Sequence, residues 1–217
     1  MPTQKLKLSA FLPYQLSITS NAVSDLIARA YRGKFALKVP EWRVMALLGE
    51  GDGDLVVHQA ASDALLGAQD HVLCANENLG ADFSAEIAVI TGDVPVGASA
   101  DDALESIRLV MLSNAISLRN VTHNVQSHPA ASFSPVAVTL DELGDAWDNG
   151  SVHLTVQVAW NGRKVGMCDA GTDMTHHFGQ LVAHASKTRA LRAGTVVNSG
   201  TVSNAGFEKN GTTEWPK

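Results

Sequence analysis

Apolar residues near the start of the chain recur with a helical period. Steps of three, four and seven residues place side chains on one face of an α-helix. The stripe consists of Leu16, Val23, Leu26, Ile27 and Ala30. Pro13 suits the first turn of such a helix, and Gly33 is placed to end it. We therefore predict a long amphipathic helix between Pro13 and Gly33.

A second, shorter helix is predicted after Pro40. Trp42, Met45 and Leu48 recur at steps of three residues, which favours a helix with one apolar side. The two helices would form an αα-hairpin at the start of the chain.

Residues 49–54, with the sequence GEGDGD, separate this hairpin from the rest of the chain. Glycines and acidic residues are unfavourable inside a helix, so the segment is interpreted as a linker. It divides the chain into an N-terminal helical hairpin, residues 1–50, and a second domain, residues 51–217.

Beyond the linker the apolar period changes to two, which is typical of β-strands. Strands are predicted over residues 86–91 and 152–160. The dipeptide Asn161-Gly162 supplies the positive φ angles of a type I′ turn, and residues 163–167 return as the partner strand. We therefore expect a β-hairpin in this half of the chain.

A helix is predicted between the first two of these strands, over residues 101–111. Its apolar stripe consists of Leu104, Ile107 and Met111. Either Ser99 or Asp101 is placed to cap its first turn, because both side chains accept hydrogen bonds from free backbone N–H groups.

A last helix is predicted over residues 175–188. One side of it consists of Phe178, Leu181, Val182 and Ala185. Ala193-Gly194 then leads into a strand over residues 195–198. Helices and strands alternate without regular βαβ spacing, so we expect the α+β class rather than a doubly wound sheet.

Composition and charge narrow the range of partners. The chain has 217 residues and a net charge of −6 at pH 7, and this balance disfavours nucleic acid, which requires a basic surface. Charged residues make up only 18% of the chain, which favours association into a homo-oligomer.

The compartment is predicted from what the sequence lacks. No apolar stretch approaches about 20 residues, the length that spans a bilayer, and no signal peptide is recognised, so we expect a cytoplasmic protein with no membrane partner. Cys74 and Cys168 lie far apart, as expected for reduced thiols rather than for a metal cluster.

The N-terminal part resembles a known family. Residues 12–50, LPYQLSITSNAVSDLIARAYRGKFALKVPEWRVMALLGE, resemble the opening of a MarR-type transcriptional regulator, with a dimerisation helix followed by the start of a second helix. In that family a winged helix-turn-helix follows and reads DNA in the major groove. Residues 55–70, which stand at this position, contain no Arg or Lys. The resemblance therefore implies a dimerisation fragment and not a DNA reader.

The longer part resembles a second family. Four runs in family order carry this resemblance over about residues 59–204: NLGADFSAEIAVITGDVPVGAS, IRLVMLSNAISLRNV, SFSPVAVTLDELGDAW and RAGTVVNSGTVSN. They resemble the core of a fumarylacetoacetate hydrolase-family enzyme. The resemblance implies a partial mixed β-roll and cleavage of a carbon–carbon bond in a diketo acid or related oxo-acid. It also implies Mg²⁺ or Mn²⁺ as the cofactor, held by acidic side chains.

The chain departs from this family at the metal ligands. Two glutamates of the family, spaced E-x-E, correspond to Ser84 and Glu86 in DFSAE. A third ligand, the aspartate of N-D-x-S, corresponds to Ala115 in SNAIS. Glu86 is thus the one implied metal ligand that remains, and we expect weak or absent binding of Mg²⁺ or Mn²⁺ because hard cations need several oxygen ligands.

Three further site residues follow from the resemblance. His128 stands where the family often has a lysine that stabilises developing negative charge. Arg119 is kept, and it is interpreted either as a catalytic group that clamps the substrate or as a structural ion-pair partner. Thr201, in SGTVS, matches a substrate-binding position. Glu86 also has a structural alternative, because an isolated strand glutamate is usually solvated.

The predicted helix over residues 175–188 offers a second possible metal site. Asp173, His177 and His184 could present a metal pair there, although such residues on a helix are more often solvated. We prefer the solvated interpretation.

Two classes of function stay open from the sequence. The first is a hydrolase of low or altered activity on a small oxo-acid substrate, which would use Glu86 and a substrate-held metal. The second is a non-catalytic chain, either a dimerising remnant or the product of a gene fusion. A MarR-like DNA-binding regulator ranks third.

Overall fold

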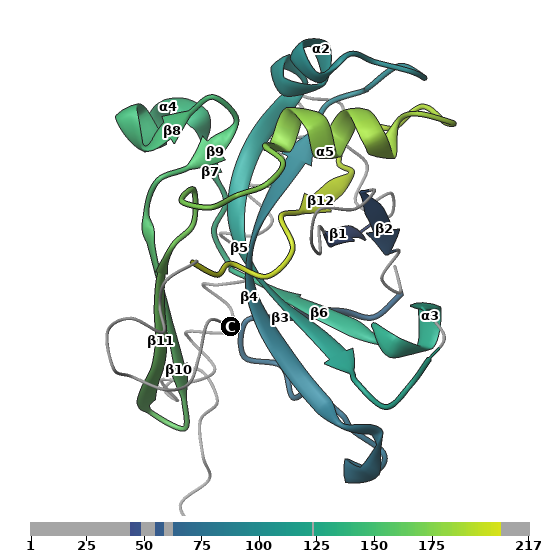
Figure 1. The fold of residues 1–217 in the computed structure, drawn as a ribbon, viewed down its shortest axis with the longest axis vertical. Helices are drawn as coiled ribbons and strands as arrows, with labels where there is room; N and C mark the ends of the chain where they lie inside the picture. The colour runs from purple at the N-terminus through teal and green to yellow at the C-terminus, as the bar shows by residue number, and fades with distance from the viewer. Residues whose placement is uncertain (1–43, 49–54, 59–62, 123, 205–217) are drawn as a thin grey trace, which may run out of the picture. The chain divides into compact units, whose positions relative to one another are not determined.

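The structure, a computed structural model, describes residues 44–48, 55–58, 63–122 and 124–204. All of them belong to one compact unit, Trp42–Lys217 (Figure 1). The predicted first helix and the predicted linker at 49–54 lie outside the described residues. The resemblance to a MarR-type regulator gains no support from the structure.

A curved β-sheet dominates this unit. Within the described residues its strand order is β2-β1-β12-β4-β5-β6-β3, and β7 also pairs with β5. Pairing is parallel for β1 with β12 and for β3 with β6, and antiparallel elsewhere. The strands are β1 (Val44–Leu48), β2 (Val56–His58), β3 (Leu65–Gly67), β4 (Ala81–Thr91), β5 (Ile107–Leu118), β6 (Ala130–Phe133), β7 (Val138–Thr139) and β12 (Val196–Asn198).

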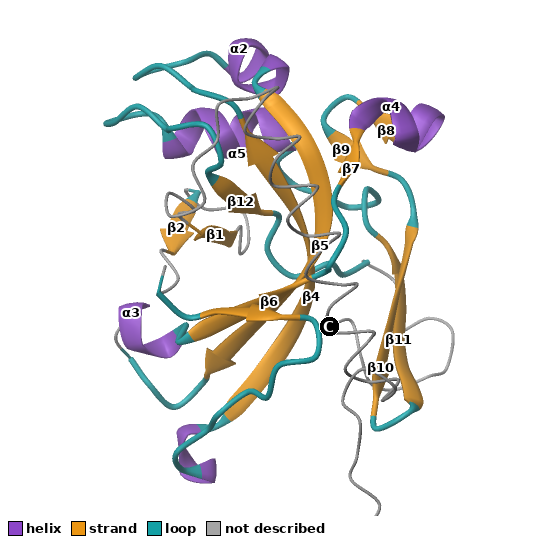
Figure 2. Cartoon of the chain, turned by 180° about the vertical axis from the view of Figure 1, so that it is seen from behind, coloured by secondary structure: helices purple, strands orange, loops and turns teal. Residues whose placement is uncertain are grey.

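Short helices and two small strand pairs complete the unit (Figure 2). The helices are α2 (Ala100–Glu105), α3 (Asn124–Ser127), α4 (Leu140–Leu143) and α5 (Phe178–Ala185), with 3₁₀ turns η3 (Glu77–Leu79) and η4 (Gly144–Ala146). The pairs are β8 (Trp147–Asp148) with β9 (Ser151–Val152), and β10 (Thr155–Trp160) with β11 (Arg163–Asp169). The expected α+β class is confirmed.

Strand β1 corrects the expectation of a second helix. Residues 44–48 form a strand that pairs with β12 on one side and with β2 on the other. A run of five mostly apolar residues fits a helix or a strand equally well by its local pattern, and here the hydrogen bonds of two neighbouring strands decide. The helical hairpin is therefore wrong over these residues.

The helix predicted over residues 101–111 is observed only in its first half. Helix α2 begins after Ser99, whose hydroxyl oxygen accepts a hydrogen bond from the Asp102 N–H at 3.1 Å, so Ser99 is the cap. The helix ends at Glu105, and β5 begins at Ile107. Residues 107–118, which are rich in apolar and β-branched side chains, pair with β4 along its whole length. These strand hydrogen bonds stabilise the segment more than a short helix with a weak apolar stripe would.

The predicted β-hairpin is confirmed. Asn161 and Gly162 have φ angles of 49° and 76°, as a type I′ turn requires, and they join β10 to β11. The strand predicted over 152–160 is broken, because His153 and Leu154 belong to neither β9 nor β10. The strand predicted over 86–91 is part of the longer β4.

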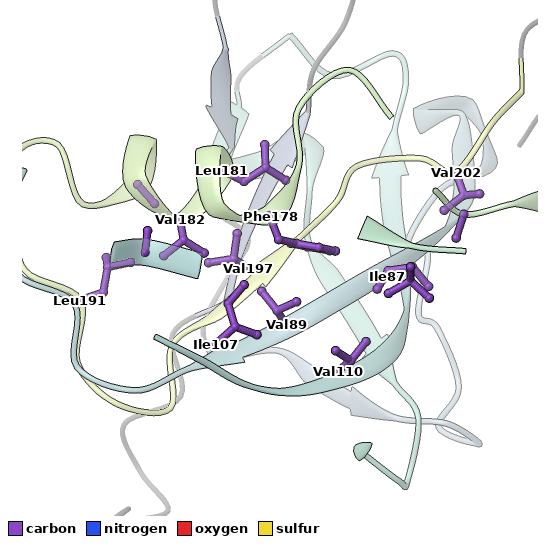
Figure 3. Packing of buried hydrophobic residues seen from close by; sticks show 14 of the residues in the cluster. Ile87, Val89, Ile107, Val110, Phe178, Leu181, Val182, Leu191, Val197 and Val202 are labelled. Carbon is purple, nitrogen blue, oxygen red and sulfur yellow. The ribbon is translucent and has the colours of Figure 1, made fainter. Parts of the chain in front are cut away.

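The main core lies between one face of the sheet and α5 (Figure 3). Its labelled members include Ile87, Val89, Val110 and Val197 from the sheet and Phe178, Leu181 and Val182 from α5. The four residues predicted to share one side of the last helix are all buried, although α5 is shorter than predicted. The strand after Gly194 is also confirmed, as β12.

Helix α5 packs very closely against α2. A Cβ atom at Gly179 would lie 2.5 Å from the carbonyl oxygen of Ala100, nearer than any side chain could approach. Glycine at this position lets the two helices cover the same end of the sheet (Figure 2). No helix in the described part of the chain is both long and apolar enough to cross a bilayer.

Candidate functional site

The pairing of β4 with β5 gathers the three implied ligand positions on one face of the sheet. Ser84 lies opposite Ala115, and Glu86 lies opposite Ser113. Residues directly opposite in antiparallel strands share a face, and side chains alternate along each strand. Ser84, Glu86 and Ala115 are therefore neighbours on the face opposite to the one that packs against α5.

Glu86 is held by two neutral hydrogen-bond donors. The Ser84 hydroxyl donates to Glu86 Oε1 at 2.9 Å, and the Asn198 amide Nδ2 donates to Glu86 Oε2 at 2.7 Å. The same Nδ2 donates to the Ser113 hydroxyl oxygen at 3.0 Å. Glu86 is only 1% exposed and Asn198 is completely buried, so the solvated alternative for Glu86 is wrong.

Burial changes the acidity of this carboxyl. It raises the pKa of Glu86 from 4.5 to about 7, although the hydrogen bonds from Asn198 and Ser84 act in the lowering direction. A carboxyl with this pKa exchanges a proton near neutral pH, which is the property of a general acid or base.

Two members of this cluster, Asn198 and Ser113, were missed by the sequence analysis. Asn198 ends the apolar strand β12, and Ser113 is the first residue of the SNAIS run. A polar residue in a strand that is otherwise apolar was the available signal. This signal did not identify the hydrogen-bond partner of Asn198, because that partner, Glu86, lies on β4, far away in sequence.

The donor set does not fit a resident divalent cation. Mg²⁺ and Mn²⁺ favour several oxygen ligands that carry negative charge. Here Glu86 supplies one carboxylate, the Ser84 hydroxyl is already directed at that carboxylate, and Ala115 has no donor atom. No group of three His, Cys, Asp or Glu side chains in the described ranges is arranged to hold a metal.

Arg119 follows β5 and forms an ion pair with Asp82, near the start of β4. The side chain of Arg119 is 61% exposed, and that of Asp82 is 14% exposed. This contact is the structural alternative that the sequence left open for Arg119. An ion pair with one exposed partner contributes little to stability.

His128 lies between α3 and β6. Its Nδ1 is 3.0 Å from the Ser127 hydroxyl oxygen. The strand that follows pairs with β5 and sets Ala131 opposite Ala115. His128 is thus placed two residues ahead of the strand that borders the Glu86 face.

Thr201 belongs to the segment that follows β12 and runs beside β4. The backbone N–H groups of Ser199 and Val202 donate to the carbonyls of Ile87 at 2.8 Å and Ala85 at 2.9 Å. Thr201 itself is exposed and lines a polar cavity of about 110 Å³. The other lining residues are Ala170, Thr172, Asp173, Met174, Thr175, His176, Leu181, Ser199, Val202 and Ser203.

Asp173, His177 and His184 form no metal-holding group in the described part of the chain. His177 precedes the helix, and its N–H donates to Gln180 Oε1 at 3.1 Å. Its ring fills the space beside two glycines, since a Cβ at Gly150 or at Gly179 would lie 3.0 Å from a ring atom. The ring is therefore a packing element next to α5.

The sequence matches a known protein family over most of its length. Residues 49–216 match the family model described as fumarylacetoacetate (FAA) hydrolase C-terminal. None of the curated proteins compared with the chain matches it.

Solved structures resemble the chain at low sequence identity. A 5-carboxymethyl-2-hydroxymuconate delta-isomerase from Mycobacterium smegmatis is 18% identical, with a TM-score of 0.62 over 73% of this chain and 67% of that one. A 2-hydroxyhepta-2,4-diene-1,7-dioate isomerase from Mycobacterium marinum is 18% identical, with a TM-score of 0.57 over 73% of this chain and 63% of that one.

A fumarylacetoacetate hydrolase from psychrophilic Exiguobacterium antarcticum is 19% identical, with a TM-score of 0.59 over 73% of this chain and 62% of that one. At such identities the likeness shows the fold alone. The chain spans about two thirds of the length of these proteins.

Proposed function

The chain belongs to the fumarylacetoacetate hydrolase family, and from this premise we propose that the sheet face around Glu86 is its reaction centre. The proposed reaction is hydrolysis of a carbon–carbon bond in a diketo acid or related oxo-acid. The proposed rate is low, because the residues that remain do not hold a resident Mg²⁺ or Mn²⁺.

One observation carries this proposal, namely the register between β4 and β5. It brings Ser84, Glu86 and Ala115 together on a single face, which is the arrangement that three ligand positions of one centre require. A shift of the register by one residue would move Ala115 to the face opposite Ser84 and Glu86.

The chemistry available from these residues explains the low proposed rate. Glu86 can accept a proton from water, because its pKa of about 7 leaves part of the population ionised at neutral pH. The proposed substrate-binding residue is Thr201. His128 is proposed to stabilise negative charge, and Arg119 is proposed to clamp the substrate. Arg119 is engaged with Asp82, so it would act weakly.

A second candidate is a non-catalytic family member that associates with copies of itself. The observation that favours it is the closed hydrogen-bond cluster around Glu86, in which each carboxylate oxygen has a neutral donor and the side chain is 1% exposed. A reacting carboxylate would have to be reached by water.

Turnover of acylpyruvates separates the two candidates. We expect slow hydrolysis, measured by loss of the enol absorbance in the presence and absence of Mn²⁺, and a loss of that activity in Glu86→Gln. The matched control is Glu105→Gln, the same chemical change at an exposed position at the end of α2, which should leave the rate unchanged. No turnover by the parent would leave the non-catalytic candidate, and equal measurable rates for the parent and Glu86→Gln would remove Glu86 as the reaction centre.

A further inference from the structure

Asn198 occupies a position that the family resemblance does not explain. It is completely buried at the end of β12, and both hydrogens of its amide Nδ2 are used, one toward Glu86 Oε2 at 2.7 Å and one toward the Ser113 hydroxyl oxygen at 3.0 Å. Glu86 and Asn198 are 112 residues apart in sequence. The contact therefore depends on the pairing of β12 with β4.

A buried carboxyl without a partner is strongly destabilising, so some group must satisfy its oxygens. In a metal centre a cation does this. Here the Ser84 hydroxyl satisfies one oxygen and the Asn198 amide satisfies the other. We propose that the Asn198 carboxamide takes the place of the divalent cation, so that the folded chain neither needs nor retains Mg²⁺ or Mn²⁺.

Amide donors also occur beside metal-ligating carboxylates, where they orient the ligand. That arrangement still needs further oxygen ligands around the cation. The residues next to Glu86 on the same face supply no second carboxylate, because Ala88 and Ala115 carry only methyl groups and Ser84 already donates to Glu86. The buried Oδ1 of Asn198 has no hydrogen-bond partner among the described residues, but it is a neutral oxygen. A cation here would have one carboxylate for two positive charges, in a place without solvent.

This inference rests on the proposed function only in taking Glu86 as the centre, and its test measures stability rather than turnover. The variant is Asn198→Asp, which keeps the shape of the side chain but replaces two donor hydrogens by an acceptor oxygen. It sets a second carboxylate against Glu86, which is destabilising unless a cation lies between them.

We expect the melting temperature of the parent to be the same in EDTA and in millimolar Mn²⁺. We expect Asn198→Asp to melt below the parent in EDTA and to gain about 5 °C or more in millimolar Mn²⁺, as a ligand that binds only the folded state requires. The matched control is Asn114→Asp. This variant makes the same Asn-to-Asp change on β5, the strand on the other side of β4. Asn114 lies opposite Ala85, so its side chain faces away from Glu86. It should show no gain with Mn²⁺.

A parent that is stabilised by Mn²⁺ would overturn the inference, whatever its turnover. So would an Asn198→Asp variant that is as stable as the parent in EDTA, or one that gains nothing from Mn²⁺. If the variant is insoluble, refolding from denaturant decides: native protein recovered only with Mn²⁺ supports the inference, and equal failure with and without Mn²⁺ overturns it. If the melting temperature of the parent does not change with Mn²⁺ and the parent hydrolyses no acylpyruvate, the proposed function is wrong but the inference about Asn198 is still supported.

Discussion

Ser84 on β4 lies directly opposite Ala115 on β5. Cross-strand neighbours of this kind have Cβ atoms about 5 Å apart. The two positions where the family resemblance implies carboxylates are therefore adjacent, and both adjoin Glu86. A single patch of the sheet thus has one carboxyl group where the resemblance implies three.

The first prediction concerns metal binding by the parent chain. Titration calorimetry with Mg²⁺ or Mn²⁺ should show weak binding at most, because one carboxylate and two neutral side chains compensate little of the cost of dehydrating a divalent cation. Tight stoichiometric binding would contradict this expectation.

The second prediction concerns restoration of the ligands. Ser84→Glu combined with Ala115→Asp should raise the affinity for Mn²⁺ well above that of the parent, because the added carboxylates join Glu86 on one face. Calorimetry on the double variant and on each single variant measures the gain. The single variants serve as controls, since each supplies only two carboxylates. An unchanged affinity in the double variant would mean that the side chains cannot converge on one ion.

The third prediction concerns pH. Burial raises the pKa of Glu86 from 4.5 to about 7 in the folded chain, so the folded state binds this proton more tightly than the unfolded state does. The resulting stabilisation is complete below pH 4.5 and is lost as the pH rises to about 7. Its size is about 3 kcal/mol at 1.36 kcal/mol per pKa unit.

Glu86→Gln separates this contribution from those of other groups, because the amide does not titrate. Urea unfolding of parent and variant at several pH values gives the difference in their free energies of unfolding. Between pH 4.5 and pH 7, the free energy of unfolding of the parent should fall by about 3 kcal/mol relative to that of Glu86→Gln. A constant difference would show that the carboxyl keeps its ordinary pKa.

The fourth prediction concerns the core between α5 and the sheet. Phe178 is 1% exposed, and its ring stacks on that of Trp147 with centroids 6.2 Å apart. Phe178→Ala should lower the free energy of unfolding by about 3–5 kcal/mol, because it removes buried apolar area and leaves a cavity. Leu154→Ala, at a side chain that is 48% exposed, should cost less than about 1 kcal/mol in the same urea titration.

The fifth prediction concerns association, which we propose takes the form of a dimer or larger homo-oligomer. In the described residues, Leu112, Trp160 and Met167 are each about half exposed, and apolar area of this kind favours a partner. The apolar stripe that includes Val23 and Ile27, outside the described residues, is the second proposed surface.

Multi-angle light scattering at micromolar concentration measures the assembly. Val23→Glu with Ile27→Glu should weaken it if the stripe carries the contact, and Met167→Glu tests the surface of the β10–β11 hairpin. A monodisperse monomer for the parent would refute the proposed association.

Local chemistry was sufficient for several elements. The turn at Asn161-Gly162 follows from the positive φ angles that these residues tolerate, and Ser99, the observed cap, is one of the two capping residues that the sequence predicts. The buried side of α5 follows from its period, because apolar side chains at helical spacing can meet only one surface. These features depend on residues close together in the chain, so they could be predicted.

Other elements were decided by distant partners. Residues 44–48 fit a helix by spacing, yet they form a strand because β12 and β2 offer hydrogen bonds on both sides. Residues 107–111 likewise continue the ladder of β4 instead of extending α2. Short apolar runs have no strong preference of their own, so tertiary pairing determines their structure.

The candidate site divides in the same way. The motifs around Glu86 indicated the family and the lost carboxylates, because those facts depend on residue identity and order along the chain. The burial of Glu86, its raised pKa and its bond to Asn198 could not be predicted, since β12 reaches β4 only in the folded sheet. Through the family resemblance, the sequence thus implies which ligand positions lack a carboxylate. Tertiary structure decided what satisfies the carboxyl that remains, because a hydrogen bond between residues 112 apart exists only when the strands that carry them are paired.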